Sequence, residues 1–311
     1  MSFEYANKLG KEGIPFIIIV SYDKSEVFVS PLSELKNHDI EFFISQNNLK
    51  QREIEHKIFS PDFSEYKERF EKIITGIKRG HTYVSNLTEE SRVEIDSNLR
   101  EIFEFSKAKY RIRFGDKFVS YSPETFIKIK SGKIETYPMK GTLDGSIENG
   151  EEILLKNEKE FAEHVMIVDL LRNDLNMVSK NVRVEKFREI EKIVSGNKSL
   201  YQMSSKIIGE LEIGWESRIG TILEKILPAG SITGTPKVKT LEIIDEVENH
   251  KRNFFTGVFG VFDGKEFDSG VMIRYLEKRN GEFFYKSGGG ITLDSKAEDE
   301  FDEVLKKIYL W

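Results

Sequence analysis

Two pairs of glutamates stand at a spacing that can serve one metal ion. Glu160 and Glu163 are three residues apart in one expected helix, and Glu300 and Glu303 repeat the pattern in another. Residues three apart share a helical face, so each pair can direct two carboxylates at one point. Oxygen donors from two helices suit Mg²⁺, which leaves room for an anionic ligand. Because the chain has 53 acidic residues, solvated helix surface is the alternative for both pairs.

Three further features could bind an anion. The loop "PAGSITGTPK" (228–237) leads into an expected helix, whose free N–H groups attract anions; an ordinary helix-initiating turn is the alternative. Gly288–Gly290 follow an expected strand and permit positive φ and close approach to a ligand, unless they form a β-bulge. Arg274 lies among apolar residues of an expected strand, where it either faces solvent or binds a carboxylate. With the glutamates, these features indicate a Mg²⁺-dependent enzyme for a small polycarboxylate.

One lysine raises a separate question. Lys140 lies in "YPMKGTL" (137–143), directly after an expected strand. It could hold a surface turn, bind an anion or act as a nucleophile. A nucleophilic role requires a lowered pKa, because a free lysine amine has a pKa near 10.4 and is almost fully protonated at neutral pH.

Composition excludes several classes of protein. The chain has 311 residues, a formal net charge of −6 and no basic stripe interleaved with aromatics, which argues against nucleic-acid binding. It has no cysteine, so disulfides and Cys-ligated zinc are excluded. The longest apolar stretch near the N-terminus, "FIIIV" (16–20), is too short to span a bilayer. We therefore expect a soluble, cytoplasmic protein without a membrane partner.

The elements that must position these residues are mixed strands and helices. Most expected strands pair as hairpins, and strands and helices do not alternate strictly, which favours an α+β fold with largely antiparallel sheet. No boundary divides the chain, so 1–311 is expected to be one domain. The expected strands are 15–22, 26–30, 82–88 and the hairpins 110–122 and 125–139. The expected helices are 60–80 with a Ser60-Pro61 start, 151–175, 215–227, 235–248 with Thr235 as N-cap, and 295–310 with a Ser295…Glu298 capping box.

The order of several motifs resembles the chorismate-utilising enzyme family. The motifs are "SPETF", "PMKGT", "EKEFAEHVMIVDLLRNDL", "PAGSITGTPK", "GVFG", "VMIRY" and "SGGGITLDSKAEDEFDE". The resemblance covers about 80–311 and is fainter in the short N-terminal region of about 1–60, which is expected to add strands. It implies a single α+β domain with two large, mostly antiparallel sheets flanked by helices. It also implies chorismate as substrate, with Mg²⁺ between the ring carboxylate and Glu163 and Glu303, and with Glu160 and Glu300 beside them.

Lys140 indicates the branch of this family. Aminodeoxychorismate synthases carry Pro-x-Lys-Gly-Thr at this motif, whereas anthranilate synthases typically carry Ala in place of the lysine. The resemblance then implies that the Lys140 amine attacks C2 of chorismate, that Glu124 of "SPETF" protonates the departing C4 hydroxyl, and that ammonia releases the lysine. The product, 4-amino-4-deoxychorismate, leads to p-aminobenzoate and folate. We expect Lys140 to be buried, to face the pocket and to lie near Glu124.

The same resemblance assigns the remaining site residues. Ser231 and Ile232 lie beside the ligand, and Arg274 with Gly288, Gly289 and Gly290 contacts the enolpyruvyl carboxylate. Gly141, Thr142 and Gln202 are assigned to substrate binding; many relatives have His where this chain has Gln202.

The resemblance also indicates a partner. Ammonia would come from a separate glutamine amidotransferase subunit, because the chain has no Cys that could act as a glutaminase nucleophile. Two rivals remain: anthranilate synthase component I, and a non-catalytic relative that only binds chorismate or the amidotransferase.

Overall fold

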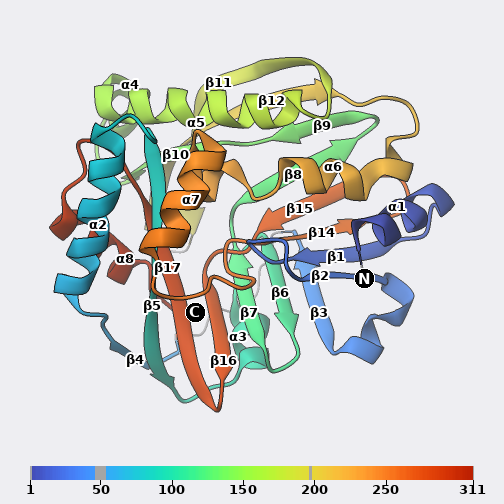
Figure 1. Ribbon diagram of the computed structural model, residues 1–311, viewed down its shortest axis with the longest axis horizontal. Helices are drawn as coiled ribbons and strands as arrows, with labels where there is room; N and C mark the ends of the chain where they lie inside the picture. The colour runs from blue at the N-terminus through green and yellow to red at the C-terminus, as the bar shows by residue number, and fades with distance from the viewer. Residues whose placement is uncertain (1, 46–53, 196–197, 311) are drawn as a thin grey trace.

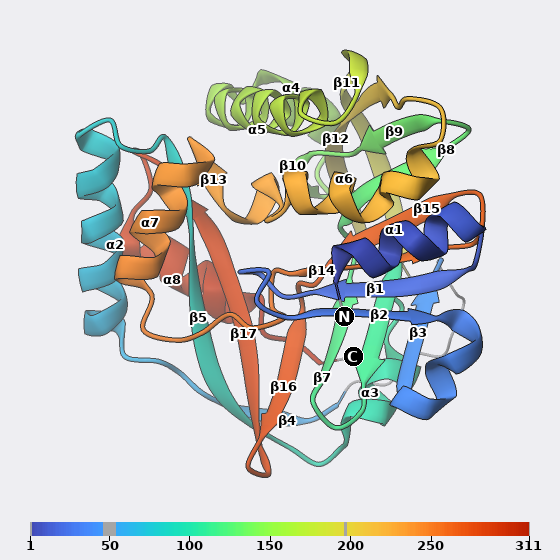
Figure 2. The same ribbon diagram turned by 45° about the vertical axis from the view of Figure 1, so that its right-hand side comes forward.

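Two large β-sheets with helices on their outer faces make up the protein (Figure 1; Figure 2). The computed structural model describes residues 2–45, 54–195 and 198–310, without the side chains of Lys140, Lys159, 193–195 and Lys198. Within these ranges every strand pair is antiparallel. The expected α+β fold is therefore confirmed.

The first sheet has the strand order β10-β12-β9-β8-β15-β14-β1-β2, and β11 pairs with β12. Its strands are β1 (Phe16–Val20), β2 (Val27–Pro31), β8 (Thr125–Lys130), β9 (Lys133–Thr136), β10 (Met139–Asp144), β11 (Lys180–Ser195), β12 (Lys198–Glu210), β14 (Val258–Phe262) and β15 (Phe267–Val271). The long β11–β12 hairpin lies at the β10 end of this sheet, beside α5 (Figure 1).

The second sheet has the order β13-β5-β17-β16-β7-β6-β3, and β4 pairs with β5. Its strands are β3 (Ile40–Ile44), β4 (His56–Phe59), β5 (Val84–Ile95), β6 (Tyr110–Phe114), β7 (Phe118–Ser122), β13 (Gly234–Thr235), β16 (Tyr275–Arg279) and β17 (Glu282–Ile291). Strand β5 is twelve residues long and contacts β4, β13 and β17, so three segments far apart in sequence meet on it.

The helices cover the outer faces of both sheets. In Figure 2, α1 and α6 lie over the first sheet, α4 and α5 over its β10 end, and α2, α7 and α8 beside β5 and β17. The α-helices are α1 (Phe3–Glu12), α2 (Phe63–Lys78), α3 (Leu99–Phe105), α4 (Gly150–Lys156), α5 (Glu158–Asn176), α6 (Ile219–Ile226), α7 (Lys237–Val247) and α8 (Ala297–Lys306). Short 3₁₀ turns are η1 (Leu32–His38), η2 (Trp215–Arg218) and η3 (Gly230–Ile232). No helix in the described ranges is long and apolar enough to cross a bilayer.

Strand β1 explains why the run "FIIIV" is apolar without interruption. Ile17 and Ile19 pack between the two sheets, in a cluster that includes Tyr110 and Tyr275. Phe16 and Ile18 point the other way, into the core under the helices. A strand covered on both faces carries apolar residues at every position rather than at alternate ones.

Several expected helix boundaries are wrong. The helix expected at 151–175 is two helices, because Asn157 is extended and its side chain accepts a hydrogen bond of 3.0 Å from Glu160 N. Asparagine is a favoured N-cap, so it starts α5 instead of continuing α4. Helix α2 starts after Asp62, which caps Glu65 N, rather than at the Ser60-Pro61 signal.

The two later helix starts also differ from expectation. Pro236, and not Thr235, is the N-cap residue of α7. Lys296 is the N-cap residue of α8, so the Ser295…Glu298 capping box does not form. The hydroxyl of Ser295 instead accepts from Thr292 N at 3.1 Å and donates to the Glu300 carboxylate at 2.7 Å. Ser295 therefore closes the turn after β17 and fixes Glu300.

Candidate active site

A pocket of about 140 Å³ opens where α5 and the loop 228–235 meet strand ends of both sheets. Its wall is mixed, with apolar side chains from α5 and polar groups from the strands and the loop. The lining residues include Glu124, Phe126, Pro138 and Met139 from the first sheet, Asn86, Gly290 and Thr292 from the second, Glu163, Met166, Ile167 and Leu170 from α5, and Ser231, Thr233 and Gly234 from the loop. Two expected motifs, "SPETF" and "PAGSITGTPK", thus meet at one cavity.

Glu124 and Ser231 are joined directly. The Ser231 hydroxyl donates a hydrogen bond to the Glu124 carboxylate, which links η3 to the segment before β8. Burial raises the pKa of Glu124, while the Ser231 hydrogen bond and the positive charges of Arg274 and Lys307 oppose that rise. A carboxyl whose pKa is raised keeps its proton closer to neutral pH, which is the property a general acid needs.

Strand β10 brings the "PMKGT" motif to the same pocket. Met139 lines the pocket, and Gly141 has φ +92, a conformation that favours glycine. A Cβ on Gly141 would lie 3.2 Å from Glu160 Oε2 and 3.0 Å from Met203 Cε. The backbone of Lys140 therefore lies between a residue that lines the pocket, Met139, and a residue close to Glu160, Gly141. The prediction that its side chain is buried concerns atoms outside the described part of the chain.

The other residues assigned with this motif lie further out. Thr142 is exposed and pairs with Gln202 across β10 and β12. The Gln202 amide donates to Met139 Sδ at 2.7 Å. Neither Thr142 nor Gln202 is among the pocket-lining residues. Through Met139, Gln202 instead supports the pocket wall from behind.

The glycine triplet forms regular strand, and no bulge. Gly288, Gly289 and Gly290 pair in register with Thr88, Leu87 and Asn86 of β5. The absence of side chains lets neighbouring groups approach this backbone closely. A Cβ on Gly288 would come within 2.7 Å of Leu87 O, and one on Gly289 would lie 3.3 Å from Glu300 Oε2. Gly290 lines the pocket.

Arg274 lies outside the strand in which it was expected. Strand β15 ends at Val271 and β16 begins at Tyr275, and Arg274 between them has φ +52. Its guanidinium lies 4.8 Å from the Tyr309 ring centroid, and its Nε is buried without a hydrogen-bond partner. It lowers the pKa of Glu124, so its charge acts on the pocket although Arg274 is not a lining residue.

Ile232 lies behind the pocket wall. Its side chain is 4% exposed and packs in the core beneath the helices. Its carbonyl faces the other way and accepts a hydrogen bond from Arg252 at 2.9 Å. The contribution of Ile232 to the site is therefore to anchor the loop that carries Ser231.

The glutamates of α5 and α8 differ in their surroundings. Glu163 lines the pocket, and the Oε2 atom of Glu160 is buried without a hydrogen-bond partner. Glu300 faces Gly289, whereas Glu303 is exposed and forms an ion pair of 2.7 Å with Lys307. Across the described residues, no three acidic or histidine side chains lie close enough together to hold a metal ion.

The donor set nevertheless suits Mg²⁺. This ion binds through one or two carboxylates, several waters and the anionic groups of a substrate, so it does not require three protein ligands. The orphaned Glu160 oxygen is a buried negative group that a cation would satisfy. Glu160 and Glu163 are the pair that fits best, because Glu163 lines the pocket and Glu160 Oε2 lies beside Gly141 of β10.

An ion pair that sequence reasoning missed ties α5 to the loop. Lys237 donates to Asp174 at 2.6 Å and to the carbonyl of Ile226 at 3.0 Å. Asp174 is at the C-terminal end of α5, and Lys237 begins α7. Asp174 and Lys237 are part of the sequence motifs "LLRNDL" and "GTPK", but only the fold shows that the two side chains are in contact.

Comparisons with known proteins identify the family of the chain. The family model for chorismate binding enzymes matches residues 10–310. An uncharacterized PabA-like protein of Haemophilus influenzae is 40% identical over 99% of this chain and 95% of its own length. Aminodeoxychorismate synthase component 1 of Bacillus subtilis is 34% identical over 81% of this chain and 56% of its own.

Among solved structures, anthranilate synthase component I of Streptococcus pneumoniae superposes with a TM-score of 0.69 at 26% identity. The superposition covers 84% of this chain and 60% of that one. This chain thus spans little more than half the length of these two named enzymes. The family model covers nearly the whole chain, and the chain belongs to the family of chorismate binding enzymes.

Proposed function

We propose that the chain is the chorismate-aminating component of an aminodeoxychorismate synthase. It converts chorismate and ammonia to 4-amino-4-deoxychorismate. The observation that carries the proposal is the position of Lys140 on β10, between pocket-lining Met139 and Gly141, which lies against Glu160. A lysine at this position of the chain is what a covalent route requires. Relatives of both the aminodeoxychorismate and the anthranilate branch match the chain, so identity alone does not choose between them.

In the first step, the neutral Lys140 amine forms a bond to C2 of chorismate. The two ring double bonds shift toward C4, and the C4–O bond breaks. Glu124 gives its proton to the departing hydroxyl, which leaves as water. Burial of Glu124 supports this role, because it raises the pKa of the carboxyl and so keeps the proton available.

In the second step, ammonia forms a bond to C4. The double bonds shift back, and the bond between Lys140 and C2 breaks. Lys140 leaves as the neutral amine, and one proton of the new C4 ammonium returns to the Glu124 carboxylate, so the chain ends the cycle unchanged. Ser231 holds the Glu124 carboxylate in place in both steps through its hydrogen bond.

Mg²⁺ is the proposed cofactor, and it supplies positive charge to the ring carboxylate of the substrate. Glu160 and Glu163 on α5 would hold it on one side, with Glu300 and Glu303 on the α8 side. Glycine at 289 keeps the second side open, because a Cβ there would lie 3.3 Å from Glu300 Oε2.

Ammonia is proposed to come from a glutamine amidotransferase subunit. The chain contains no cysteine, so it has no thiolate with which to attack glutamine. The isolated chain should therefore use ammonium salts and leave glutamine untouched.

A product assay tests the proposal. The purified chain is incubated with chorismate, MgCl₂ and ammonium sulfate, and products are identified by mass spectrometry. Aminodeoxychorismate without pyruvate release supports the proposal. Fluorescent anthranilate with stoichiometric pyruvate would assign the chain to the rival branch. Binding of chorismate without any product would favour the non-catalytic relative, and turnover with glutamine alone would remove the partner from the proposal.

A further inference from the structure

We propose that Arg252, together with Glu248, is a positioning pair that holds the 228–235 loop against β5 and thereby sets the Ser231–Glu124 hydrogen bond. This proposal deepens the proposed function and rests on it for the role of Glu124. Neither residue lines the 140 Å³ pocket. Both act from behind its wall.

The Arg252 guanidinium is buried, with 3% of the residue exposed, and binds three parts of the chain at once. It donates to the carbonyl of Ile232 at 2.9 Å and to the carbonyl of Asn86 at 2.8 Å. Its Nε and Nη2 atoms donate to the two oxygens of Glu248 at 2.8 and 2.6 Å. The planar fork of arginine allows this arrangement, which a lysine ammonium cannot reproduce.

Glu248 extends the contacts of this pair, which we call the clamp, to Thr88 of β5. Its Oε1 atom also accepts from the Thr88 amide at 3.0 Å and from the Thr88 hydroxyl at 2.7 Å. Asn86 and Thr88 pair with Gly290 and Gly288 in the neighbouring strand. The ion pair therefore fixes the part of β5 that supports the glycine platform.

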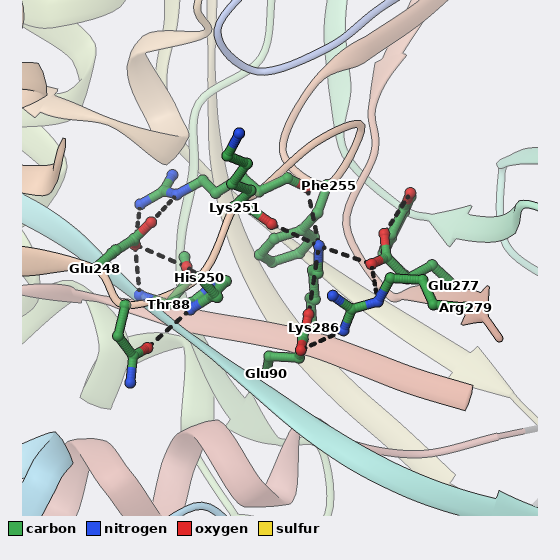
Figure 3. A network of polar contacts seen from close by, with 12 residues as sticks. Thr88, Glu90, Glu248, His250, Lys251, Phe255, Glu277, Arg279 and Lys286 are labelled. Carbon is green, nitrogen blue, oxygen red and sulfur yellow. Dashed lines mark hydrogen bonds and ion pairs between the residues drawn. The ribbon is translucent and has the colours of Figure 1, made fainter. Parts of the chain in front are cut away.

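A second buried cation sets the backbone that carries Arg252. Lys286 is fully buried and donates to the carbonyls of Lys251 at 2.7 Å and Arg252 at 3.3 Å. Its ammonium is paired with Glu277 at 3.2 Å and with Glu90 at 3.6 Å. Figure 3 shows the Lys286 ammonium between Lys251 on one side and Glu277 on the other, with Glu90 below.

The link from Arg252 to the site is one residue long. Ile232 follows Ser231 directly, so holding the Ile232 carbonyl holds the backbone that presents the Ser231 hydroxyl to Glu124. The loop is also tied to β5 by a hydrogen bond of 2.8 Å from Asn86 N to the Thr233 carbonyl and by the pairing of β13 with Ser85 and Val84. Small displacements of a catalytic group reduce rates strongly, so a more mobile loop would lower the rate of the reaction.

The test is a double-mutant cycle between Arg252→Lys and Ser231→Ala, read as kcat/KM for chorismate. We expect Arg252→Lys to lower kcat/KM by about tenfold, or 1.4 kcal/mol, in the parent. In the Ser231→Ala background we expect a loss of less than about twofold, because the hydrogen bond it supports is already gone. An equal loss in both backgrounds would show a general structural role and overturn the proposal.

Arg113→Lys is the matched control. Arg113 is 5% exposed and paired with Asp39 and Glu41, but it lies on β6, away from the pocket. It should lower the melting temperature while leaving kcat/KM within about twofold in both backgrounds. A tenfold loss from Arg113→Lys would mean that breaking the ion pairs of any buried arginine has this effect, and would count against the clamp.

Hydrogen exchange gives an arm that does not depend on activity. Arg252→Lys, and equally Glu248→Gln, should speed amide exchange at Asn86, whose N–H is bonded to the loop, whereas Arg113→Lys should not. Unchanged exchange at Asn86 in both variants would overturn the clamp. If the parent makes no aminodeoxychorismate but exchange rises as expected, the proposed function fails and the clamp itself stands.

Discussion

The hydroxyl of Ser231 donates a hydrogen bond to the carboxylate of Glu124, across the junction between η3 and the start of β8. This bond lowers the pKa of a carboxyl that burial raises. Ser231→Ala should therefore raise the pKa of Glu124 further. A general acid works while protonated, so activity falls as pH rises through this pKa, and the alkaline limb of kcat/KM should move to higher pH.

Ser146→Ala is the control for this measurement. Ser146 also donates its hydroxyl to a carboxylate, that of Asp144, at 2.6 Å, but the pair lies on the exposed surface. Its pH profile should match the parent. An alkaline limb that stays in place in Ser231→Ala would show that Glu124 is not the acid observed in the profile.

Lys140 should form a covalent adduct when ammonia is withheld. With chorismate and Mg²⁺ alone, intact-protein mass spectrometry should detect protein plus chorismate minus water, located on Lys140 by peptide mapping. Lys140→Ala should lose the adduct and most aminodeoxychorismate formation and still bind chorismate. Lys130→Ala, at an exposed position in the β8–β9 hairpin, should retain both. Normal turnover by Lys140→Ala would end the nucleophile hypothesis.

Glu160→Gln should weaken the response to Mg²⁺ more than it weakens the fold. The substitution keeps the shape but removes the charge on an oxygen that is buried without a hydrogen-bond partner. We expect turnover to collapse, the Mg²⁺ concentration for half-maximal rate to rise at least about tenfold, and the melting temperature to stay or increase. Glu158→Gln, exposed in the same first helical turn, should behave as the parent. Undiminished activity in EDTA would remove the metal from the mechanism.

His250 should make the protein less stable in mild acid. Burial lowers its pKa from 6.5 to about 4, so between these values the unfolded chain binds more protons than the folded one. The free energy of unfolding from this group is therefore highest above pH 6.5 and falls as pH drops toward 4, by up to about 3 kcal/mol.

Denaturant titrations at pH 7, 5.5 and 4.5 measure this loss. His250→Gln should lose less stability than the parent over this range, because glutamine does not titrate. His81→Gln, at an exposed position, should follow the parent curve. Parallel curves for all three proteins would show that His250 is not protonated on unfolding.

The class of the fold could be predicted from short-range patterns, and the pocket motifs from their order along the chain, which resembles a known family. The turn residues of a hairpin such as β8–β9, where Ser131 and Gly132 have positive φ, predict antiparallel pairing from the local sequence. The Gly-rich loop 228–234 and the "SPETF" segment do line one cavity. Helix boundaries were less accessible, since whether Asn157 continues a helix or caps the next one depends on backbone that only packing decides.

The clamp behind the pocket could not be predicted from sequence. Glu248 and Arg252 read as one more charged cluster after a helix, among 100 charged residues in which most face solvent. Their burial results from the meeting of α7, β5 and η3, which are far apart along the chain. Likewise, the apolar wall that Met166 and Leu170 contribute to the pocket looks from sequence like ordinary helix core.

Strands β5 and β17 pair without a break from Phe283–Val93 to Ile291–Ser85. A sheet can change such pairing only by whole register steps, and a step of one residue would send every side chain to the opposite face. The part of the pocket wall formed by Asn86 of β5 and Gly290 of β17 therefore cannot shift by small amounts. Differences in substrate or product between proteins with this fold therefore have to come from the loop 228–235, from β10 or from α5. The backbone of β5 and β17 keeps the same position in all of them.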